Sequence, residues 1–283
     1  MSEQILKDKI LDTQLLSEGF VVIPFLKTIE VNDLLHFYHQ NHTNEIPGFY
    51  ASVFSTNISL REEITNKIQS IYIRIIENTF INYKLIGGIF IVKTNKEKER
   101  LHPHQDWAFI DEKIYRGFNI WIPLVDINEQ NGAIRITPKS HLWVNNFRGP
   151  KIEDAFPNKQ EEIWQNMITL NLKAGEALIY DARLFHASFP NQTEQPRIAT
   201  VFGAIPKNAK MYHYIGDGDF VDIYESNEAF FLSSNINNGA NVLNKLERVK
   251  NLSIKSKEIP DYMGEKMVPS ETKASWFSRI FNK

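Results

Sequence analysis

Residues 118–136, FNIWIPLVDINEQNGAIRI, contain the two runs that decide the class of fold. Residues 118–124 and 133–136 are short and rich in β-branched and aromatic side chains, a composition typical of strands. Asn131-Gly132 lies just before the second run and is a turn signal. The stretch therefore predicts two consecutive strands whose connection contains a tight turn.

Runs of the same kind recur on both sides of this stretch. Residues 89–92, 176–180 and 198–204 have the same composition, and turn signals stand at residues 173–175 and 190–191. No regular helical pattern separates these runs. The predicted core is therefore an antiparallel sandwich or barrel and not a parallel α/β sheet.

The N-terminal third has a different pattern. Residues 3–16, 29–39 and 59–83 carry apolar side chains at helical spacing. Gly19 follows the first of these segments and leads into the strand-like run of residues 20–23. We therefore expect helices in this third of the chain, together with a first strand.

These patterns predict one domain spanning residues 1–283, with insertions over a single core. The expected parts are N-terminal helices and a first strand that pack on the barrel (1–86), a jelly-roll core (87–206) with an insertion (142–167), and a C-terminal lid or extension (207–283). After Pro206 the pattern indicates loop and then a helix around residues 240–249.

Composition excludes several classes of protein. The 42% of hydrophobic residues can form a core, and 32 basic against 34 acidic residues give a net charge of −2, which does not favour nucleic acid as a partner. Cysteine is absent, so disulfides, Cys-type zinc sites and thiol nucleophiles are excluded, and any metal must be bound by His, Asp and Glu. No signal-peptide pattern and no transmembrane run is present, so we expect a cytoplasmic protein.

The stretch Leu101-His102-Pro103-His104-Gln105-Asp106-Trp107 holds the most informative polar residues. Residues i and i+2 of a strand project to the same face, so His104 and Asp106 can reach one metal ion. Such a pair alone is weak evidence for a metal site.

The second half of the chain adds His186 and Arg197. Two imidazoles and one carboxylate on adjacent strands cover one face of an octahedral ion and leave three positions open, the pattern of non-haem Fe(II) oxygen chemistry. Arg197 opens the next predicted strand and offers the bidentate, permanently charged group that a dicarboxylate co-substrate requires.

Together these residues resemble the phytanoyl-CoA dioxygenase family of Fe(II)/2-oxoglutarate-dependent oxygenases. The resemblance rests on His104-Gln105-Asp106-Trp107, on His186 and Arg197, and on the block of residues 131–141, NGAIRITPKSH. That block resembles the family's Asn-Gly-apolar-x-x-x-Pro-Gly-Ser-His signature, with Lys139 in place of the glycine. The resemblance covers residues 19–205, and Lys139 is expected to alter only the turn that it occupies.

The resemblance implies a mainly β fold with flanking helices, namely a double-stranded β-helix of the jelly-roll or cupin-like type. It implies that His104, Asp106 and His186 bind Fe(II) as the catalytic triad, and that Arg197 binds 2-oxoglutarate. O₂ is the second co-substrate, and hydroxylation of an unactivated C–H bond of a small molecule is the default outcome. The presence of Asp106 argues against the halogenating variants.

Further residues are weaker candidates. Those for 2-oxoglutarate binding lie on or near predicted strands and are Lys93, Asn119, Thr137 and Ser188. Those for the substrate are His102, Trp107, Phe109, Arg135 and Arg148. The two arginines suggest an anionic or zwitterionic substrate, whose identity the sequence leaves open together with the oligomeric state.

Two alternatives stay open at this point. The same iron site can produce desaturation, epimerisation or cyclisation, because these outcomes share the abstraction of a hydrogen atom. A barrel with the same site can also act as a non-catalytic metabolite-binding module.

Overall fold

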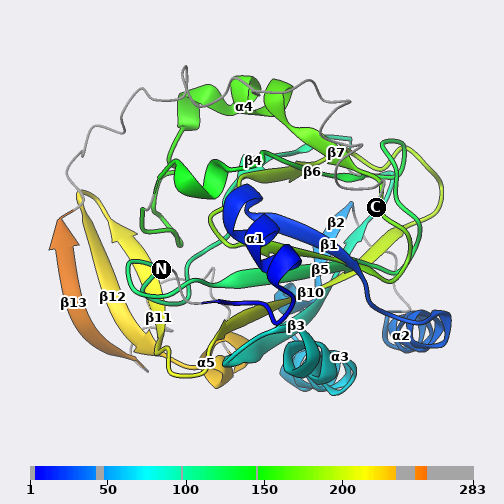
Figure 1. Ribbon diagram of the computed structural model, residues 1–283, viewed down its shortest axis with the longest axis horizontal. Helices are drawn as coiled ribbons and strands as arrows, with labels where there is room; N and C mark the ends of the chain where they lie inside the picture. Colours follow the sequence, from blue (N-terminus) through cyan, green and yellow to red (C-terminus); the bar gives the residue numbers. More distant parts are fainter. Residues whose placement is uncertain (1–3, 43–47, 97, 145, 234–245, 254–283) are drawn as a thin grey trace.

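The computed structural model describes residues 4–42, 48–96, 98–144, 146–233 and 246–253. Two antiparallel β-sheets face each other, helices cover the outer side of the larger sheet, and a third small sheet lies beside them (Figure 1). Residues 240–245 of the expected C-terminal helix and residues 254–283 of the expected extension lie outside the described residues.

The larger sheet has six strands in the order β1-β8-β5-β10-β3-β2, and every neighbouring pair is antiparallel. Its strands are β1 (Phe20–Pro24), β8 (Glu176–Asp181), β5 (Phe118–Pro123), β10 (Arg197–Pro206), β3 (Tyr83–Lys93) and β2 (Phe49–Ala51). The strand predictions at residues 20–23, 118–124, 176–180 and 198–204 are therefore confirmed with differences of one or two residues at the ends, and the strand predicted at 89–92 begins six residues earlier, at Tyr83.

The facing sheet has four shorter strands in the order β4-β9-β6-β7. These are β4 (Leu101–His104), β9 (His186–Ser188), β6 (Ile134–Ile136) and β7 (Ile168–Leu170). Side chains from the inner faces of both sheets fill the space between them, among them Trp121 and Leu178 from the larger sheet and Ile136 from the smaller one. The antiparallel barrel expected from the sequence is confirmed.

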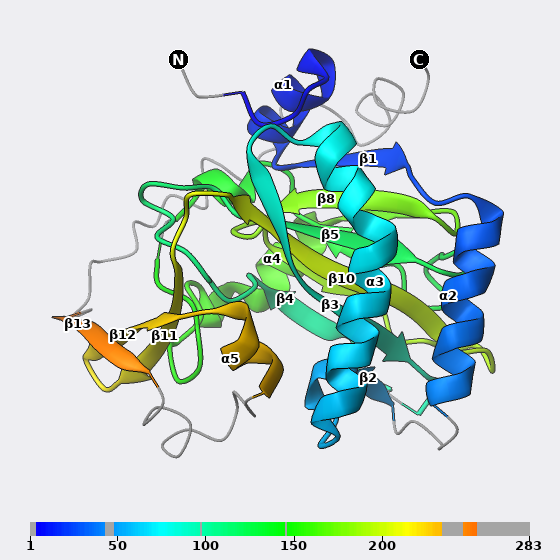
Figure 2. The same ribbon diagram turned by 90° about the horizontal axis from the view of Figure 1, so that it is seen from below.

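Three helices pack on the outer face of the larger sheet (Figure 2). They are α1 (Lys9–Glu18), α2 (Thr28–Asn41) and α3 (Ile58–Thr79). Alternation along β5 explains the two cores, since Ile120 and Ile122 pack toward the helices while Trp121 packs between the sheets. The helix α3 ends four residues before the predicted end because Tyr83 already begins β3.

The segment after Pro206 differs from the prediction of loop followed by helix. Strands β11 (Met211–Asp217), β12 (Phe220–Ser226) and β13 (Glu247–Ser253) form an antiparallel sheet, and α5 (Glu228–Ser233) follows β12. Gly218 has a positive φ of 56° in the two-residue turn between β11 and β12, which is the backbone that a tight hairpin requires. Hydrophobic side chains of this hairpin, such as Val221, are buried.

The predicted insertion at residues 142–167 is largely irregular. It is flanked by the 3₁₀ turn η2 (Ser140–Leu142) and contains η3 (Pro157–Lys159) and α4 (Gln160–Asn166). Trp164 of α4 packs with Phe156 and Phe185 in a separate apolar cluster on the outer side of the smaller sheet (Figure 1). The division into 1–86, 87–206 and 207–283 within one domain stays a prediction.

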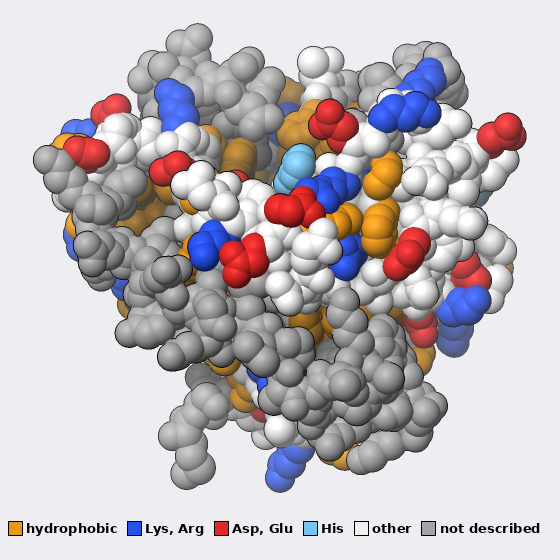
Figure 3. All heavy atoms as spheres, turned by 90° about the horizontal axis from the view of Figure 1, so that it is seen from above, with side chains coloured by type: hydrophobic (Ala, Val, Ile, Leu, Met, Phe, Trp, Pro, Cys, Tyr) orange, Lys and Arg blue, Asp and Glu red, His pale blue; other side chains and the backbone are white. Residues whose placement is uncertain are grey.

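No helix among the described residues is long and apolar enough to cross a bilayer. On the face shown in Figure 3, acidic and basic side chains alternate and neither sign forms a continuous patch. This distribution agrees with the near-zero net charge of −2.

Lys139 adopts the left-handed conformation that favours glycine, with φ 66° and ψ −2°. The left-handed region costs a non-glycine residue about 1–2 kcal/mol, whereas glycine loses about 0.5–1 kcal/mol of unfolded-state entropy. We therefore expect Lys139→Gly to raise the free energy of unfolding by about 0.5–1 kcal/mol in urea titrations. Lys139→Ala is the control, because it keeps the strained backbone and removes the contact of the Lys139 side chain with Glu18. An equal gain in stability for the alanine and glycine variants would show that the left-handed backbone is not the cause.

Candidate metal centre

Three candidate ligands converge at one end of the smaller sheet. His104 ends β4 and His186 begins β9, and the two residues lie directly opposite each other in the antiparallel register. Their ligand atoms and those of Asp106 all lie within 4.8 Å of one another. Because β4 ends at His104, Asp106 lies in the loop that follows and not on the strand, which differs from the expected strand geometry.

Both imidazoles are oriented by the backbone. The Nδ1 atom of His104 lies 2.8 Å from the carbonyl oxygen of His102, and that of His186 lies 3.0 Å from the carbonyl oxygen of Leu184. A protonated Nδ1 donates to each carbonyl, which leaves the lone pair of Nε2 for a metal. Burial lowers the pKa of His186 to about 4, so its imidazole is neutral at pH 7.

The Asp106 carboxylate accepts two hydrogen bonds on one oxygen. Asn119 Nδ2 donates to Oδ2 at 2.6 Å, and the hydroxyl of Tyr180 donates to the same atom at 2.9 Å. Burial by itself would raise the pKa of Asp106, but His186, His104 and these two donors bring that pKa below its ordinary value. Asp106 is therefore a carboxylate near neutral pH.

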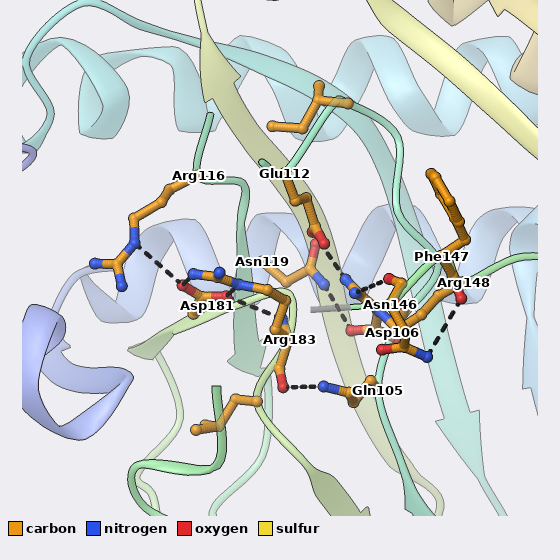
Figure 4. Close-up of polar contacts among 12 residues, drawn as sticks. Gln105, Asp106, Glu112, Arg116, Asn119, Asn146, Phe147, Arg148, Asp181 and Arg183 are labelled. Carbon is orange, nitrogen blue, oxygen red and sulfur yellow. Dashed lines mark hydrogen bonds and ion pairs between the residues drawn. The ribbon is translucent and has the colours of Figure 1, made fainter. Parts of the chain in front are cut away.

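The loop that carries Asp106 is held from both sides (Figure 4). Arg148 donates from Nε to the carbonyl oxygen of Asp106 at 2.7 Å and from Nη2 to Glu112 at 2.8 Å. On the other side Gln105 donates to the carbonyl oxygen of Arg183 at 2.5 Å. These contacts fix the backbone on both sides of the ligand.

Arg197 and Lys93 form a second part of the site. They are directly opposite each other on β10 and β3, and their exposed fractions are 3% and 1%. Arg197 donates to the carbonyl oxygen of Gly132 at 2.9 Å and has Trp121 under its guanidinium, yet its Nε has no hydrogen-bond partner among the described residues. Burial lowers the pKa of Arg197 to about 10, so it remains a cation at neutral pH.

Lys93 joins this part of the site to the metal ligands. Its ammonium donates to Ser188 Oγ at 2.9 Å and to the carbonyl oxygen of Phe189 at 2.7 Å. Ser188 is two residues after His186 on β9 and so lies on the same face. Thr137 follows β6 beside His186, and its buried Oγ1 has no hydrogen-bond partner in the described part of the chain.

The arginines proposed to bind an anionic substrate are engaged elsewhere. Ile136 of β6 is paired with His186, and Arg135 lies on the opposite face of that strand. There the guanidinium of Arg135 stacks on Trp164 and donates to the carbonyl oxygen of Met167. Arg148 forms a buried ion pair with Glu112. The charge of Arg148 is thus balanced, and Arg135 points away from the three candidate ligands.

The remaining substrate candidates have mixed positions. His102 has an exposed side chain, and its carbonyl oxygen orients His104. Phe109 packs on Phe231 of α5. Trp107 is half-buried next to Asp106 and is the aromatic candidate nearest in sequence to a ligand.

Sequence reasoning missed Tyr180 and Glu112 and gave Asn119 a different role. Tyr180 lies two residues after Leu178 on β8, so the alternation of the strand already placed it on the inner face. Glu112 carried no local signal, because its partner Arg148 is 36 residues away.

The donor set fits one kind of metal centre. Two imidazoles and one carboxylate are the ligands of the 2-His-1-carboxylate triad of non-haem Fe(II) sites. The buried cation with an unsatisfied Nε fits a carboxylate group of a co-substrate. The fold and site thus define a β-barrel protein with a triad-type metal centre.

The family follows from comparison with known sequences. A model of the phytanoyl-CoA dioxygenase (PhyH) family matches residues 32–199, more than half of the 283 residues. The chain belongs to this family, and the resemblance inferred from the motifs is confirmed.

Curated relatives are similar over shorter regions. Dioxygenase olcK of Penicillium canescens is 32% identical over 79 residues, which are 28% of this chain and 22% of that protein. Dioxygenase trt7 of Aspergillus terreus is 29% identical over 85 residues, which are 30% of this chain and 26% of that protein. The matched region thus spans about a quarter of the length of these two relatives.

Solved structures share the fold. The epimerase SnoN, in complex with Fe3+, alpha ketoglutarate and nogalamycin RO, superposes with a TM-score of 0.53 at 22% identity over 72% of this chain and 85% of that chain. EvdO2 from Micromonospora carbonacea var. aurantiaca, complexed with 2-oxoglutarate, gives a TM-score of 0.50 at 19% identity over 70% and 91% of the two chains. This likeness confirms the double-stranded β-helix, or jelly-roll, fold.

Proposed function

We propose that this protein is an Fe(II)- and 2-oxoglutarate-dependent oxygenase of a small organic molecule. The observation that carries the proposal is the convergence of His104, Asp106 and His186 in a barrel that also buries the cation of Arg197. Membership of the phytanoyl-CoA dioxygenase family supports it. The predicted cytoplasmic location is part of the proposal.

In this proposal His104, Asp106 and His186 hold the metal through one face and leave the opposite face for co-substrates. When bound, Fe(II) supplies the oxidation of a C–H bond by O₂, coupled to decarboxylation of 2-oxoglutarate to succinate and CO₂. Arg197 binds the distal carboxylate of 2-oxoglutarate, and its unsatisfied Nε offers a donor. In the same proposal, buried Lys93 adds positive potential to the 2-oxoglutarate site. Hydroxyl groups are added by Ser188 and Thr137.

The protein also protects the reaction from water. The guanidinium of Arg197 and the side chain of Trp121 are buried between the two sheets, so the co-substrate displaces few water molecules there. Electrostatic interactions gain strength in such a site because the local dielectric constant is low.

Hydroxylation is the proposed outcome, with desaturation, epimerisation and cyclisation as alternatives on the same site. The mass of the product separates them, since hydroxylation adds one oxygen atom and desaturation removes two hydrogens. A non-catalytic metabolite-binding barrel would release no succinate when a substrate is added.

The test is an anaerobic titration of the protein with Fe(II) and 2-oxoglutarate. We expect the weak visible charge-transfer band of the chelate in the wild-type protein and its loss in Asp106→Ala, because two imidazoles alone hold the metal weakly. Succinate release on addition of O₂ is then measured with candidate small molecules. Iron binding without the band would contradict the co-substrate assignment, and no iron binding would contradict the metal centre.

A further inference from the structure

Two donors from adjacent strands meet on one oxygen of Asp106. Asn119 on β5 and Tyr180 on β8 are directly opposite each other in the antiparallel register, so both side chains lie on the inner face of the larger sheet. Their polar atoms are 2.6 Å and 2.9 Å from Asp106 Oδ2 (Figure 4 shows the Asn119 contact). The carboxylate itself comes from the loop after β4 of the opposite sheet.

These contacts occupy the acceptor capacity of one carboxylate oxygen. Each oxygen of an ionised carboxylate has about two lone-pair sites, and an amide N–H and a phenolic O–H fill both sites of Oδ2. The same oxygen, Oδ2, lies 3.5 Å from Nε2 of His186. The two donors therefore also fix the rotation of the carboxylate about its Cβ–Cγ bond.

The donors are well suited to this task. Tyr180 is 3% exposed, and its ring centroid lies 5.0 Å from that of His186. The Asn119 amide is a donor at every pH.

We infer that Asn119 and Tyr180 are positioning residues that hold the Asp106 carboxylate in one orientation beside the candidate ligand His186. Asn119 then acts through the ligand and not by direct contact with 2-oxoglutarate. This inference rests on the metal centre of the proposed function.

The test compares Mn(II) binding by the wild-type protein, Tyr180→Phe, Asn119→Leu and the double variant, without turnover. The electron paramagnetic resonance signal of free Mn(II) reports the unbound metal. Loss of hydrogen bonds to metal ligands typically weakens metal binding by about 10- to 100-fold. We expect a loss in this range for the double variant and a smaller loss for each single variant, because one donor still holds Oδ2.

Tyr72→Phe is the matched control. Tyr72 is fully buried and its hydroxyl bonds Thr200 at 2.7 Å, away from Asp106, so its removal should leave Mn(II) affinity unchanged. Melting temperatures of all variants show whether a change in affinity reflects loss of folding. An equal loss of affinity in Tyr72→Phe would contradict the inference as well.

The outcomes separate this inference from the proposed function. Unchanged Mn(II) affinity in the folded double variant overturns the positioning role, whether or not the wild-type protein releases succinate. The expected loss of affinity without any succinate release from the wild type retains the positioning role and overturns the oxygenase. A wild-type protein that binds no Mn(II) overturns both.

Discussion

Replacement of Arg197 by methionine is expected to weaken 2-oxoglutarate binding by at least about 30-fold. Truncating one partner of a buried, hydrogen-bonded charge pair costs about 2–5 kcal/mol, and 1.4 kcal/mol corresponds to a factor of ten. Metal binding should stay the same, because the ligands lie on β4, on the loop after it and on β9, while Arg197 is on β10. The measurement is the 2-oxoglutarate concentration at half-maximal charge-transfer band under anaerobic conditions.

The same substitution should not destabilise the protein in the absence of 2-oxoglutarate. Arg197 is 3% exposed and forms no ion pair with any described residue, so removal of its charge relieves a desolvation cost that offsets the lost bond to Gly132. A structural arginine would show the opposite pattern, with a lower melting temperature and unchanged 2-oxoglutarate affinity. That result would refute the co-substrate role.

Arg135→Met provides the matched control for this comparison. Arg135 is also buried and also donates to a single backbone carbonyl, but it stacks on Trp164 at the outer side of the smaller sheet. We expect its loss to leave 2-oxoglutarate affinity unchanged. A similar loss of affinity in both variants would mean that the effect is not specific to Arg197.

The sequence predicted those parts of the molecule that depend on local patterns. Five strands of the larger sheet and β6 contain apolar runs bounded by turn residues, each visible in a few consecutive residues, whereas β2 and β7 were not predicted. The structure brings together His104, Asp106 and His186, the candidate ligands that the resemblance to the family implied. The hairpin of β11 and β12 also has a local signal, the two-residue Gly218-Asp219 turn.

What the sequence could not supply is the pairing of distant polar groups. In the sequence Arg148 has no visible partner, and only the fold brings Glu112 beside it. For Arg135, only the register of β6 shows which face of the strand it occupies. Asn119 was placed near the site, yet only the register of β5 against β8 reveals that it and Tyr180 share one acceptor. Strand register and loop packing decide these roles, and neither is a property of a single short segment.

Replacement of Arg148 by methionine is expected to lower the free energy of unfolding by about 3–5 kcal/mol, the cost of removing one member of a buried ion pair. Arg148 and Glu112 have side-chain exposures of 6% and 5% and are 2.8 Å apart. Urea unfolding followed by tryptophan fluorescence measures the loss. Lys173→Met is the control, because Lys173 pairs with Asp126 at the same distance of 2.8 Å but both side chains are exposed, and little change is expected.

The double variant Arg148→Met/Glu112→Leu separates folding from function. Replacing both members of a buried pair by apolar residues is often neutral for stability, so most of the lost free energy should return. The bond from Arg148 Nε to the carbonyl oxygen of Asp106 is still missing, however, and the loop of the metal ligand loses its support. We therefore expect near-normal unfolding together with weakened Mn(II) binding, because the ion pair serves to hold Asp106 in place. Full recovery of Mn(II) affinity in the stable double variant would show that Arg148 only balances the charge of Glu112.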